Sequence, residues 1–341
     1  ITLNLESTEG RELFRRLTAT ADIVLETFPP GYLPALGLGY KDLAAGNPGL
    51  VVCSLTPFGQ TGPWRDYLTC DLAHLAAGGQ MASSGYDSDD VADAPPIAPG
   101  GGNAWHIGSH YAYMAIIAAL MFRSTSGQGQ YIDASVHDAC ALTTEMHVNT
   151  YIYQGQVVRR QTGRHAAVTP TPLSQLRCKD GKYVNASAAR VTLRLFPALV
   201  EWMDSHGLAG DLTEERYLEP VVFSASEAHI DEVVANFAAN MTRDEIAHGG
   251  QERGFNWGAV RAPDELVDEG HLTDRGFWID VPHPELGKIL KYPGPAAIYN
   301  GSPWRISNRA PLIGEHNEEI FCSELGLQKT ELAYLAEAGV V

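Results

Sequence analysis

The chain has 341 residues, of which 45% are hydrophobic, and it carries a formal net charge of −17. This length and composition predict a globular protein of two domains, each with a substantial core. The charge disfavours nucleic acid and anionic lipid as partners, because the 24 Lys and Arg residues are scattered without a basic run. The longest apolar stretch, residues 111–122, is shorter than the roughly 20 residues that cross a membrane. We therefore expect neither a nucleic-acid nor a membrane partner.

The five cysteines are widely spaced and lack any C-x-x-C pair; they are Cys53, Cys70, Cys140, Cys178 and Cys322. This usage predicts reduced core thiols in a cytoplasmic protein, without a zinc site. Residues 1–5 have the alternating pattern of a strand that leads directly into a helix. We expect no signal peptide there and a chain that begins within its fold.

Short apolar strands alternate with helices in the first part of the chain. Ser7 or Thr8 can cap a first helix. Strands are expected at 21–28, 50–55 and 131–135, and helices at 40–45, 107–122 and from Val136 through Met146. This alternation predicts an α/β fold with a parallel sheet and crossover connections.

The pattern changes from about Pro170 onward. Residues 178–184 predict a β-hairpin with Asp180-Gly181 at its turn. Further helices are expected at about 193–203, 226–240 and 332–338. We predict three parts: an α/β large domain over 1–165, a small α+β domain over 170–285, and a segment, 286–341, that returns to the large domain.

Three groups of residues have a superficial resemblance to ligand sites. The aspartates of residues 85–99 lack the spacing of a calcium loop, so we interpret them as solvated charges: Asp87, Asp89, Asp90 and Asp93. Residues 100–102 are glycines without the Lys and Ser/Thr of a phosphate-binding P-loop. His106 and His110 are four residues apart, as helical metal ligands can be, but packing roles are favoured for both. His165 and His316 are likewise expected to be structural or interfacial.

Six motifs in order along the chain carry a family resemblance. They are Glu-Thr-Phe-Pro-Pro-Gly at 26–31 with Leu-Gly-Leu-Gly-Tyr at 36–40, and the segments 47–54, 58–63, 127–130, 274–277 and 309–316. Together they resemble class III CoA transferases, the formyl-CoA transferase and carnitine CoA-transferase family. The resemblance implies a Rossmann-like large domain, which in this chain is without its first βα unit, and a small α+β domain joined to it by long linkers, with two subunits interlocked.

The resemblance also implies a reaction in which CoA thioesters are substrates and no cofactor is tightly bound. A nucleophilic aspartate attacks the acyl-CoA thioester and forms an anhydride. An aspartyl-CoA thioester follows, and CoA then passes to the acceptor acid. The covalent route divides one difficult exchange into easier steps.

The position of that aspartate is occupied by Trp105 in this chain. An indole N–H only donates a hydrogen bond, so it cannot replace a carboxylate nucleophile. We therefore expect no catalytic residue in this chain, although Asp93 or Asp133 could substitute if the alignment is shifted.

The residues expected to bind CoA also depart from the family pattern. Glu6 and Ala35 stand where the family has a lysine and an arginine. An anion in place of a cation near phosphate costs roughly 1 kcal/mol or more at an effective dielectric of about 20. CoA binding is expected to be weak, with residues 27–29 (Thr27, Phe28 and Pro29) as a vestigial site.

Asp71 and His106 are the substrate-pocket candidates, and for Asp71 a helix-capping role is an equal alternative. The racemase branch of the family uses a histidine where this chain has Cys70, so racemase activity is disfavoured. The defect resembles the subunit of succinyl-CoA:benzylsuccinate CoA-transferase, an enzyme of anaerobic aromatic degradation, that lacks the aspartate. A non-catalytic subunit paired with a catalytic paralogue is therefore predicted, acting on an acyl-CoA and an organic acid. The alternatives are a self-sufficient transferase that uses another acid and a non-enzymatic stabilising homologue.

Overall fold

The computed structural model describes residues 1–87, 90–144, 146–186 and 191–341. The chain divides into two compact units, each treated by itself below. Unit 1 comprises Ile1–Gly78, Pro99–Thr144 and Glu269–Val341, and unit 2 comprises Gly79–Ala98 and Glu145–Asp268. The domain limits expected from the sequence stay a prediction.

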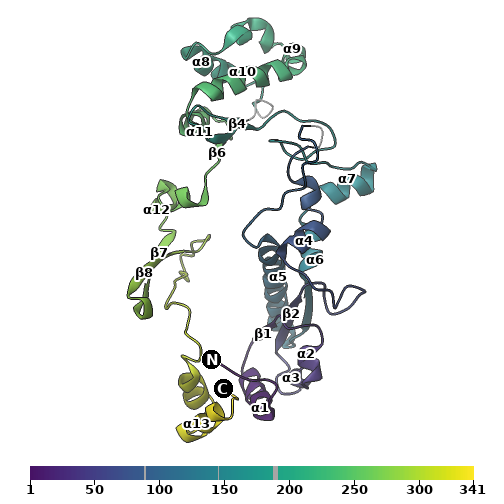
Figure 1. The fold of residues 1–341 in the computed structure, drawn as a ribbon, viewed down its shortest axis with the longest axis vertical. Coiled ribbons are helices and arrows are strands. Elements are labelled where there is room, and N and C mark those ends of the chain that lie inside the picture. Colours follow the sequence, from purple (N-terminus) through teal and green to yellow (C-terminus); the bar gives the residue numbers. More distant parts are fainter. Residues whose placement is uncertain (88–89, 145, 187–190) are drawn as a thin grey trace. The chain divides into compact units, whose positions relative to one another are not determined.

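Unit 1 contains a parallel sheet of order β1-β2-β3, formed by Ile23–Glu26, Val51–Thr56 and Tyr131–Ser135 (Figure 1). The register pairs Ile23 with Val51 and Val52 with Tyr131. β2 is the central strand and its side chains are almost wholly buried. The α/β class with a parallel sheet is thus confirmed. β1 lies inside its expected range, and β2 and β3 begin and end within one residue of their expected limits.

Helices separate these strands, as the alternation predicted. They are α1 (Thr8–Thr18), α2 (Tyr32–Ala35), α3 (Tyr40–Ala44), α4 (Asp71–Ala77), α5 (Asn103–Ser126) and α6 (Val136–Leu142). Ser7 caps α1, because its hydroxyl accepts a hydrogen bond from the Gly10 N–H at 2.9 Å. None of the helices of the described residues is long and apolar enough to cross a membrane.

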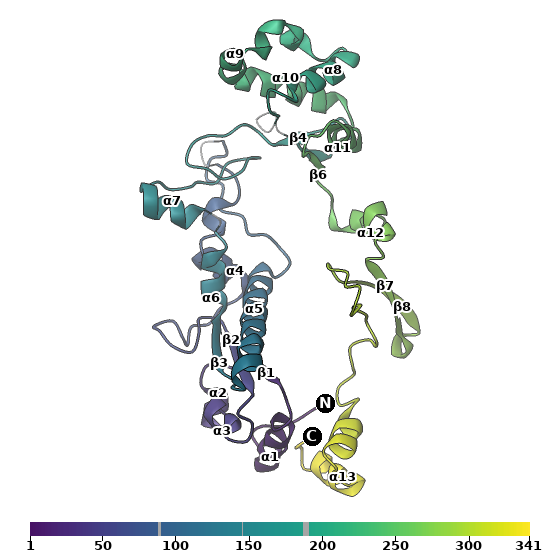
Figure 2. The ribbon, with the colours of Figure 1, turned by 180° about the vertical axis from the view of Figure 1, so that it is seen from behind.

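The helix α5 lies along the sheet, where it packs against β2 and β3 (Figure 2). Its buried residues recur at helical spacing and are Ala104, Gly108, Ala112, Ile116 and Ala119. Small residues on this face allow a close approach of neighbouring elements: a Cβ on Gly108 would lie 2.8 Å from a methyl carbon of Val136 in α6.

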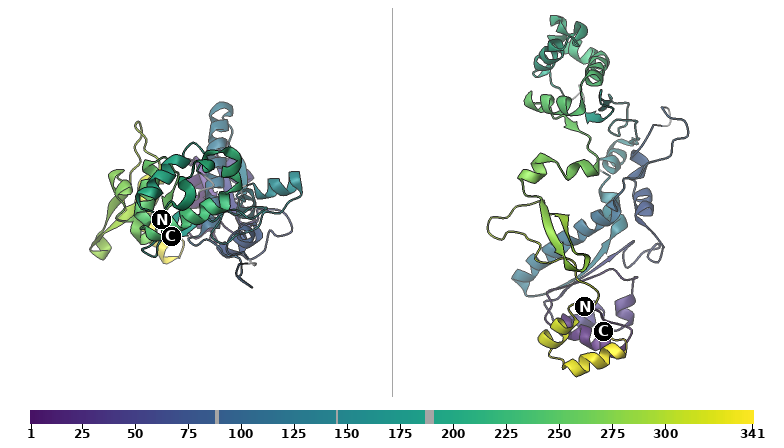
Figure 3. Two further views of the ribbon diagram at one scale, coloured as in Figure 1. Left: turned by 90° about the horizontal axis from the view of Figure 1, so that it is seen from above. Right: turned by 60° about the vertical axis from the view of Figure 1, so that its left-hand side comes forward.

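Two sequence expectations in unit 1 are wrong. Residues 1–5 form no strand; instead the Asn4 N–H donates to the Val340 carbonyl at 2.8 Å, so the two ends of the chain lie together (Figure 3). α6 ends at Leu142, because the hydroxyls of Thr143 and Thr144 donate to carbonyls of the last turn, at 2.9 and 3.1 Å. The next position of that expected helix, residue 145, lies outside the described residues.

The C-terminal part of unit 1 holds an antiparallel hairpin and the last helices. The strands β7 (Trp278–His283) and β8 (Lys288–Pro293) pair in register from Trp278 with Pro293 to His283 with Lys288. α12 (Gly270–Asp274) precedes them, and a π-helical segment (Glu318–Glu324) and α13 (Lys329–Glu337) follow.

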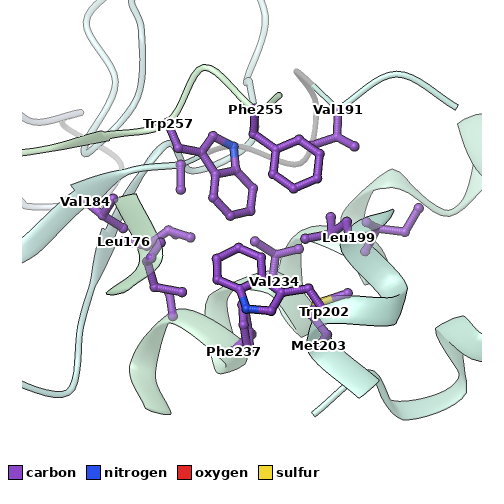
Figure 4. Packing of buried hydrophobic residues seen from close by; sticks show 14 of the residues in the cluster. Leu176, Val184, Val191, Leu199, Trp202, Met203, Val234, Phe237, Phe255 and Trp257 are labelled. Carbon is purple, nitrogen blue, oxygen red and sulfur yellow. The ribbon is translucent and has the colours of Figure 1, made fainter. Parts of the chain in front are cut away.

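Unit 2 combines a small antiparallel sheet with helices. The strands are β4 (Gln175–Arg177), β5 (Tyr183–Asn185) and β6 (Gly258–Ala259), and the helices are α7 (His147–Gln154), α8 (Phe196–Ser205), α9 (Pro220–Ala225), α10 (Glu227–Asn240) and α11 (Arg243–Glu252). The predicted hairpin is confirmed: β4 and β5 are antiparallel, and Gly181 takes the left-handed conformation of its turn with φ +79°. The core gathers aromatic and aliphatic side chains around Trp202, Phe237 and Trp257 (Figure 4).

Candidate functional site

The carboxyl ends of the three parallel strands of unit 1 are joined by Gln60. Its N–H donates to both carboxylate oxygens of Asp133 on β3, at 3.0 and 3.1 Å. Its side-chain carbonyl accepts from the Gly31 N–H, in the loop after β1, at 3.1 Å. Ligands of parallel α/β sheets bind at this end of the strands. Gln60 therefore holds the loops at the edge of the sheet where a substrate site is expected.

A pocket of about 410 Å³, here called the aromatic pocket, opens at this edge. Its lining comprises residues 58, 59, 61–64, 133, 135, 137 and 138. Phe58 contacts Trp64 edge-on with ring centroids 5.8 Å apart, and His137 lies 5.3 Å from Trp64. Asp133 and Asp138 are the charged side chains of the lining. The pocket thus offers apolar rings and negative charge, a poor environment for the phosphates of CoA.

A second pocket, of about 370 Å³, lies among α2, α3, the three strands of the sheet and Gln60. Its charged lining residues are Glu26, Lys41 and Asp42. Glu26 is 9% exposed, and its carboxylate accepts from the Phe28 N–H at 2.7 Å. Burial, together with the negative charge of Glu26, raises the pKa of the nearby Cys53 thiol to about 11. Here too carboxylates outnumber cations.

Trp105 lies in the first turn of α5, with 41% of its surface exposed. Its indole meets the imidazole of His74 edge to face, with ring centroids 5.2 Å apart. Asp71, in the first turn of α4, accepts a hydrogen bond from the Ala104 N–H at 2.8 Å. The structure therefore brings Trp105 and Asp71 together, and the Asp71 carboxylate caps the positive end of α5.

His74 is fully buried behind Trp105. Its ring lies 5.1 Å from Phe58 and 6.5 Å from His137, which places it between Trp105 and the aromatic pocket. Burial, reinforced by His137, lowers the pKa of His74 below its ordinary value, so the ring is neutral near pH 7. Neither of its nitrogens has a hydrogen-bond partner among the described residues.

The residues expected from the sequence to form a vestigial CoA site, Thr27, Phe28 and Pro29, are exposed in the loop after β1. The Phe28 ring stacks on Tyr32, with centroids 4.7 Å apart. Tyr32 in turn donates its hydroxyl to Glu6 at 2.7 Å, which raises the pKa of the tyrosine. Glu6 thus lies beside this loop and adds negative charge to it. Ala35, at the end of α2, is also exposed.

The remaining candidates are dispersed. His106 and His110 are exposed on α5, where a ring nitrogen of His110 contacts the His106 carbonyl at 2.7 Å. Asp93 lies in a loop of unit 2 with φ +59°. Across the described residues no group of three or more His, Cys, Asp or Glu is arranged to hold a metal ion.

Two more of these residues belong to other surroundings or to none described. His316 lines a pocket of about 380 Å³ with Arg309 and Glu315. Asp89 lies outside the described residues. The expectation that all cysteines are core thiols is wrong for Cys70, which is exposed, whereas Cys53, Cys140 and Cys178 are buried.

The aromatic pocket and the buried His74 could not be predicted from the sequence. Their rings come from residues 58–67, α4 and α6; α6 is distant from the other two in sequence, and the three segments share no periodic pattern. One signal was present: Gln60 belongs to the Phe-Gly-Gln-Thr-Gly-Pro motif at 58–63, which lies directly after β2.

Comparisons with known proteins agree on one family. The model of CoA-transferase family III matches residues 1–317. Succinyl-CoA–D-citramalate CoA-transferase of Chloroflexus aurantiacus is 30% identical over 341 residues, covering 100% of this chain and 82% of the relative. Subunit BbsE of succinyl-CoA:(R)-benzylsuccinate CoA-transferase from Thauera aromatica is 29% identical over 99% of this chain and 81% of its own. The crystal structure of a CAIB/BAIF family protein from Brucella suis superposes with a TM-score of 0.74 at 26% identity, covering 95% of this chain and 80% of that one.

Proposed function

Since the chain belongs to CoA-transferase family III, we propose that it is one subunit of a heteromeric, cytoplasmic transferase that moves CoA from succinyl-CoA to an organic acid. A catalytic paralogue supplies the nucleophilic aspartate. Both relatives named above carry succinyl-CoA in their names, and one of them is named as a subunit, which supports the donor and the heteromeric arrangement. An acid of the benzylsuccinate type, from anaerobic aromatic degradation, is one candidate acceptor.

The observation that carries this proposal is Trp105 at the start of α5, where the family resemblance expects the aspartate. The indole has no electron pair available to attack a thioester. The adjacent carboxylate, Asp71, is engaged with the Ala104 N–H and stabilises the end of the helix. A nucleophile for the anhydride step is therefore sought on another chain.

The charges around the pockets support a weak role for this chain in binding CoA. Asp133 and Asp138 line the aromatic pocket, and Glu26 and Asp42 line the neighbouring one. Phosphates placed near these carboxylates would meet repulsion. In this proposal the chain completes the fold of the complex and contributes surface to the partner's pocket, and it does not hold CoA by itself.

The face of α5 that points away from the sheet supports a partner chain. It exposes large apolar side chains at Tyr113, Met114, Ile117, Met121 and Phe122. A helix that is apolar on all sides is typically buried within a larger assembly, and an exposed apolar patch of this kind marks an interaction site. A paralogous subunit is the occupant that we propose.

Co-expression with the paralogue tests the proposal. We expect the chain alone to show no transferase activity with succinyl-CoA, and the complex to be active. In the complex, Trp105→Phe should preserve turnover, whereas loss of the aspartate on the paralogue should abolish it. A homomer of this chain with full activity would contradict the heteromeric hypothesis. Adduct trapping with hydroxylamine should label the paralogue and leave this chain unlabelled.

One observation favours a second candidate function, a self-sufficient transferase. Asp133 lines the aromatic pocket, although both of its oxygens accept from the Gln60 N–H. If Asp133 were the nucleophile, Asp133→Asn would abolish activity of the chain alone, and Asp138→Asn, which changes a neighbouring acid of the same pocket, would leave it. The same activity assay on Asp93→Asn tests Asp93 as the nucleophile. A merely stabilising homologue would instead lower the partner's stability on removal and spare its turnover per folded molecule.

A further inference from the structure

The strongest local excess of positive charge in this acidic chain lies in unit 2. Three arginines occur within residues 159–164, and no Asp or Glu occurs from Met146 to Lys179, although the chain has 41 acidic residues. Arginines without acidic neighbours in the sequence, in a chain whose net charge is −17, indicate an anionic ligand. The surroundings of Arg159 show how such a ligand can be held.

The loop that carries these arginines is fixed at both ends. Arg159 and Ala167 pair as an isolated antiparallel bridge, with N–H to carbonyl distances of 3.0 and 3.1 Å in the two directions. Gln161, which is only 6% exposed, donates to the Thr169 carbonyl at 3.0 Å and accepts from the Thr171 N–H at 2.8 Å. The backbone around Arg159 is therefore set before any ligand arrives.

The neighbouring arginine is committed to the structure. Arg160 donates to the carbonyls of Tyr86 and Ala94, at 2.6 and 3.1 Å, and so ties the loop to residues 79–98. The side chain of Arg159 differs: it is exposed, and it makes no ion pair or side-chain hydrogen bond with any of the described residues. Arg160 thus holds the loop in place, whereas the guanidinium of Arg159 can bind a ligand.

Arg159 lines a pocket of about 350 Å³. The other walls include apolar groups from Ala82, Val168 and Pro170 and the polar residue Thr169. A planar guanidinium binds a carboxylate through two parallel hydrogen bonds, and the apolar wall suits a short carbon chain. Asp87 also lines this pocket, which disfavours a phosphate, with two negative charges on one group, relative to a carboxylate group, which carries one.

We propose that this pocket binds one carboxylate of a short-chain organic acid on Arg159. Resting on the proposed function, the site identifies unit 2 of this chain as the part that recognises the acid rather than the CoA. The pocket lies wholly within unit 2, so it can be tested on the full chain without a partner.

Binding of succinate to the full-length chain, followed by calorimetry or ligand-observed NMR, tests the site. We expect millimolar affinity, a loss of tenfold or more in Arg159→Gln, and a smaller loss in Arg159→Lys, because an ammonium ion cannot form the paired hydrogen bonds. Arg177→Gln, at an exposed arginine of β4 in the same unit, is the matched control and should bind as the parent does.

Three results would overturn the proposal: equal binding by Arg159→Gln and the parent, equal binding of the neutral isostere succinamide, or binding of inorganic phosphate as tight as that of succinate. The readout needs no turnover. An active homomer would refute the heteromeric function and leave the carboxylate site intact, so the two failures can be told apart. Because Arg159 has no side-chain partner among the described residues, its replacement is expected to leave folding unchanged.

Discussion

The core of unit 2 and the helix α5 of unit 1 differ in where their large apolar side chains lie. In unit 2, large apolar side chains are buried against one another, with Trp257 1% and Phe237 0% exposed. On α5, small residues face the sheet, and large side chains such as Tyr113 and Met121 stay 61% and 68% exposed. Apolar area gives stability only where it leaves water. The core of unit 2 is thus filled by its own side chains, whereas α5 leaves large apolar side chains in contact with water.

The contrast extends to the chemistry. Unit 2 carries an arginine, Arg159, whose side chain has no partner among the described residues, and unit 1 has a tryptophan where the family resemblance expects a nucleophile. Its sheet edge nevertheless keeps the pockets, held together by Gln60. This unit therefore combines pockets at the end of its sheet with an indole at the position where the family resemblance expects a carboxylate. Such a combination fits a chain whose contribution is made next to another one.

The largest expected effect comes from Trp257→Ala. This side chain packs against Trp202 and Phe255, with ring centroids 6.1 and 5.0 Å away. Its removal leaves a cavity, so we expect the free energy of unfolding of unit 2 to fall by about 3–5 kcal/mol. Urea denaturation followed by fluorescence measures it. If the loss were below about 1 kcal/mol, Trp257 would not be a central part of the core of unit 2.

Overpacking the same core should cost less. A Cβ on Gly249 would lie 2.4 Å from the Trp202 ring, so Gly249→Val forces the ring or the helix α11 to move. We expect a loss of about 1–3 kcal/mol in the same denaturation experiment. Gly258→Val is the matched control, because Gly258 has open space around its Cβ position and should change stability by less than about 0.5 kcal/mol. Equal effects of the two substitutions would contradict the packing argument.

Most of the parallel sheet could be predicted from the sequence, because apolar runs, caps and turn glycines act over a few residues. The strand predicted for the first five residues was wrong because only their local alternation was considered. Their hydrogen-bond partners lie more than 300 residues away, at Asn317 and Val340. The site escaped prediction where it depends on tertiary contacts. The bond from Ala104 to Asp71 spans 33 residues and no local pattern indicates it. Trp105 was found because the family resemblance supplied the register.

The exposed face of α5 provides the next test of the comparison. Met121→Lys places a charge on this face without touching the sheet, since Met121 is 68% exposed. We expect association with the paralogue to weaken by more than about 1 kcal/mol, as for a side chain near the centre of an interface. Sedimentation or titration calorimetry with the purified paralogue measures it. The melting temperature of the chain alone should stay unchanged, which separates association from folding. Unchanged association would leave the face without the partner that we propose.

The smallest expected effect is a dependence of stability on pH in unit 1. Arg309 binds Glu315 through both carboxylate oxygens, each at 2.9 Å, and together with the Leu312 N–H it lowers the pKa of Glu315 from 4.5 to about 2. Because the folded-state pKa lies below the unfolded one, the stabilisation is complete above pH 4.5 and is lost as the pH falls from there toward 2. The melting temperatures of the parent and of Glu315→Gln should therefore differ at pH 7 and converge on acidification. Because Glu315 lies at the surface, added salt should narrow the difference at pH 7. A constant gap between pH 7 and pH 3 would assign the effect to the lost hydrogen-bond geometry rather than to charge. If the unfolding transition of unit 2, followed by fluorescence, shifted in parallel in Glu315→Gln, the two units would not unfold separately. The difference in stability proposed between them would then be wrong.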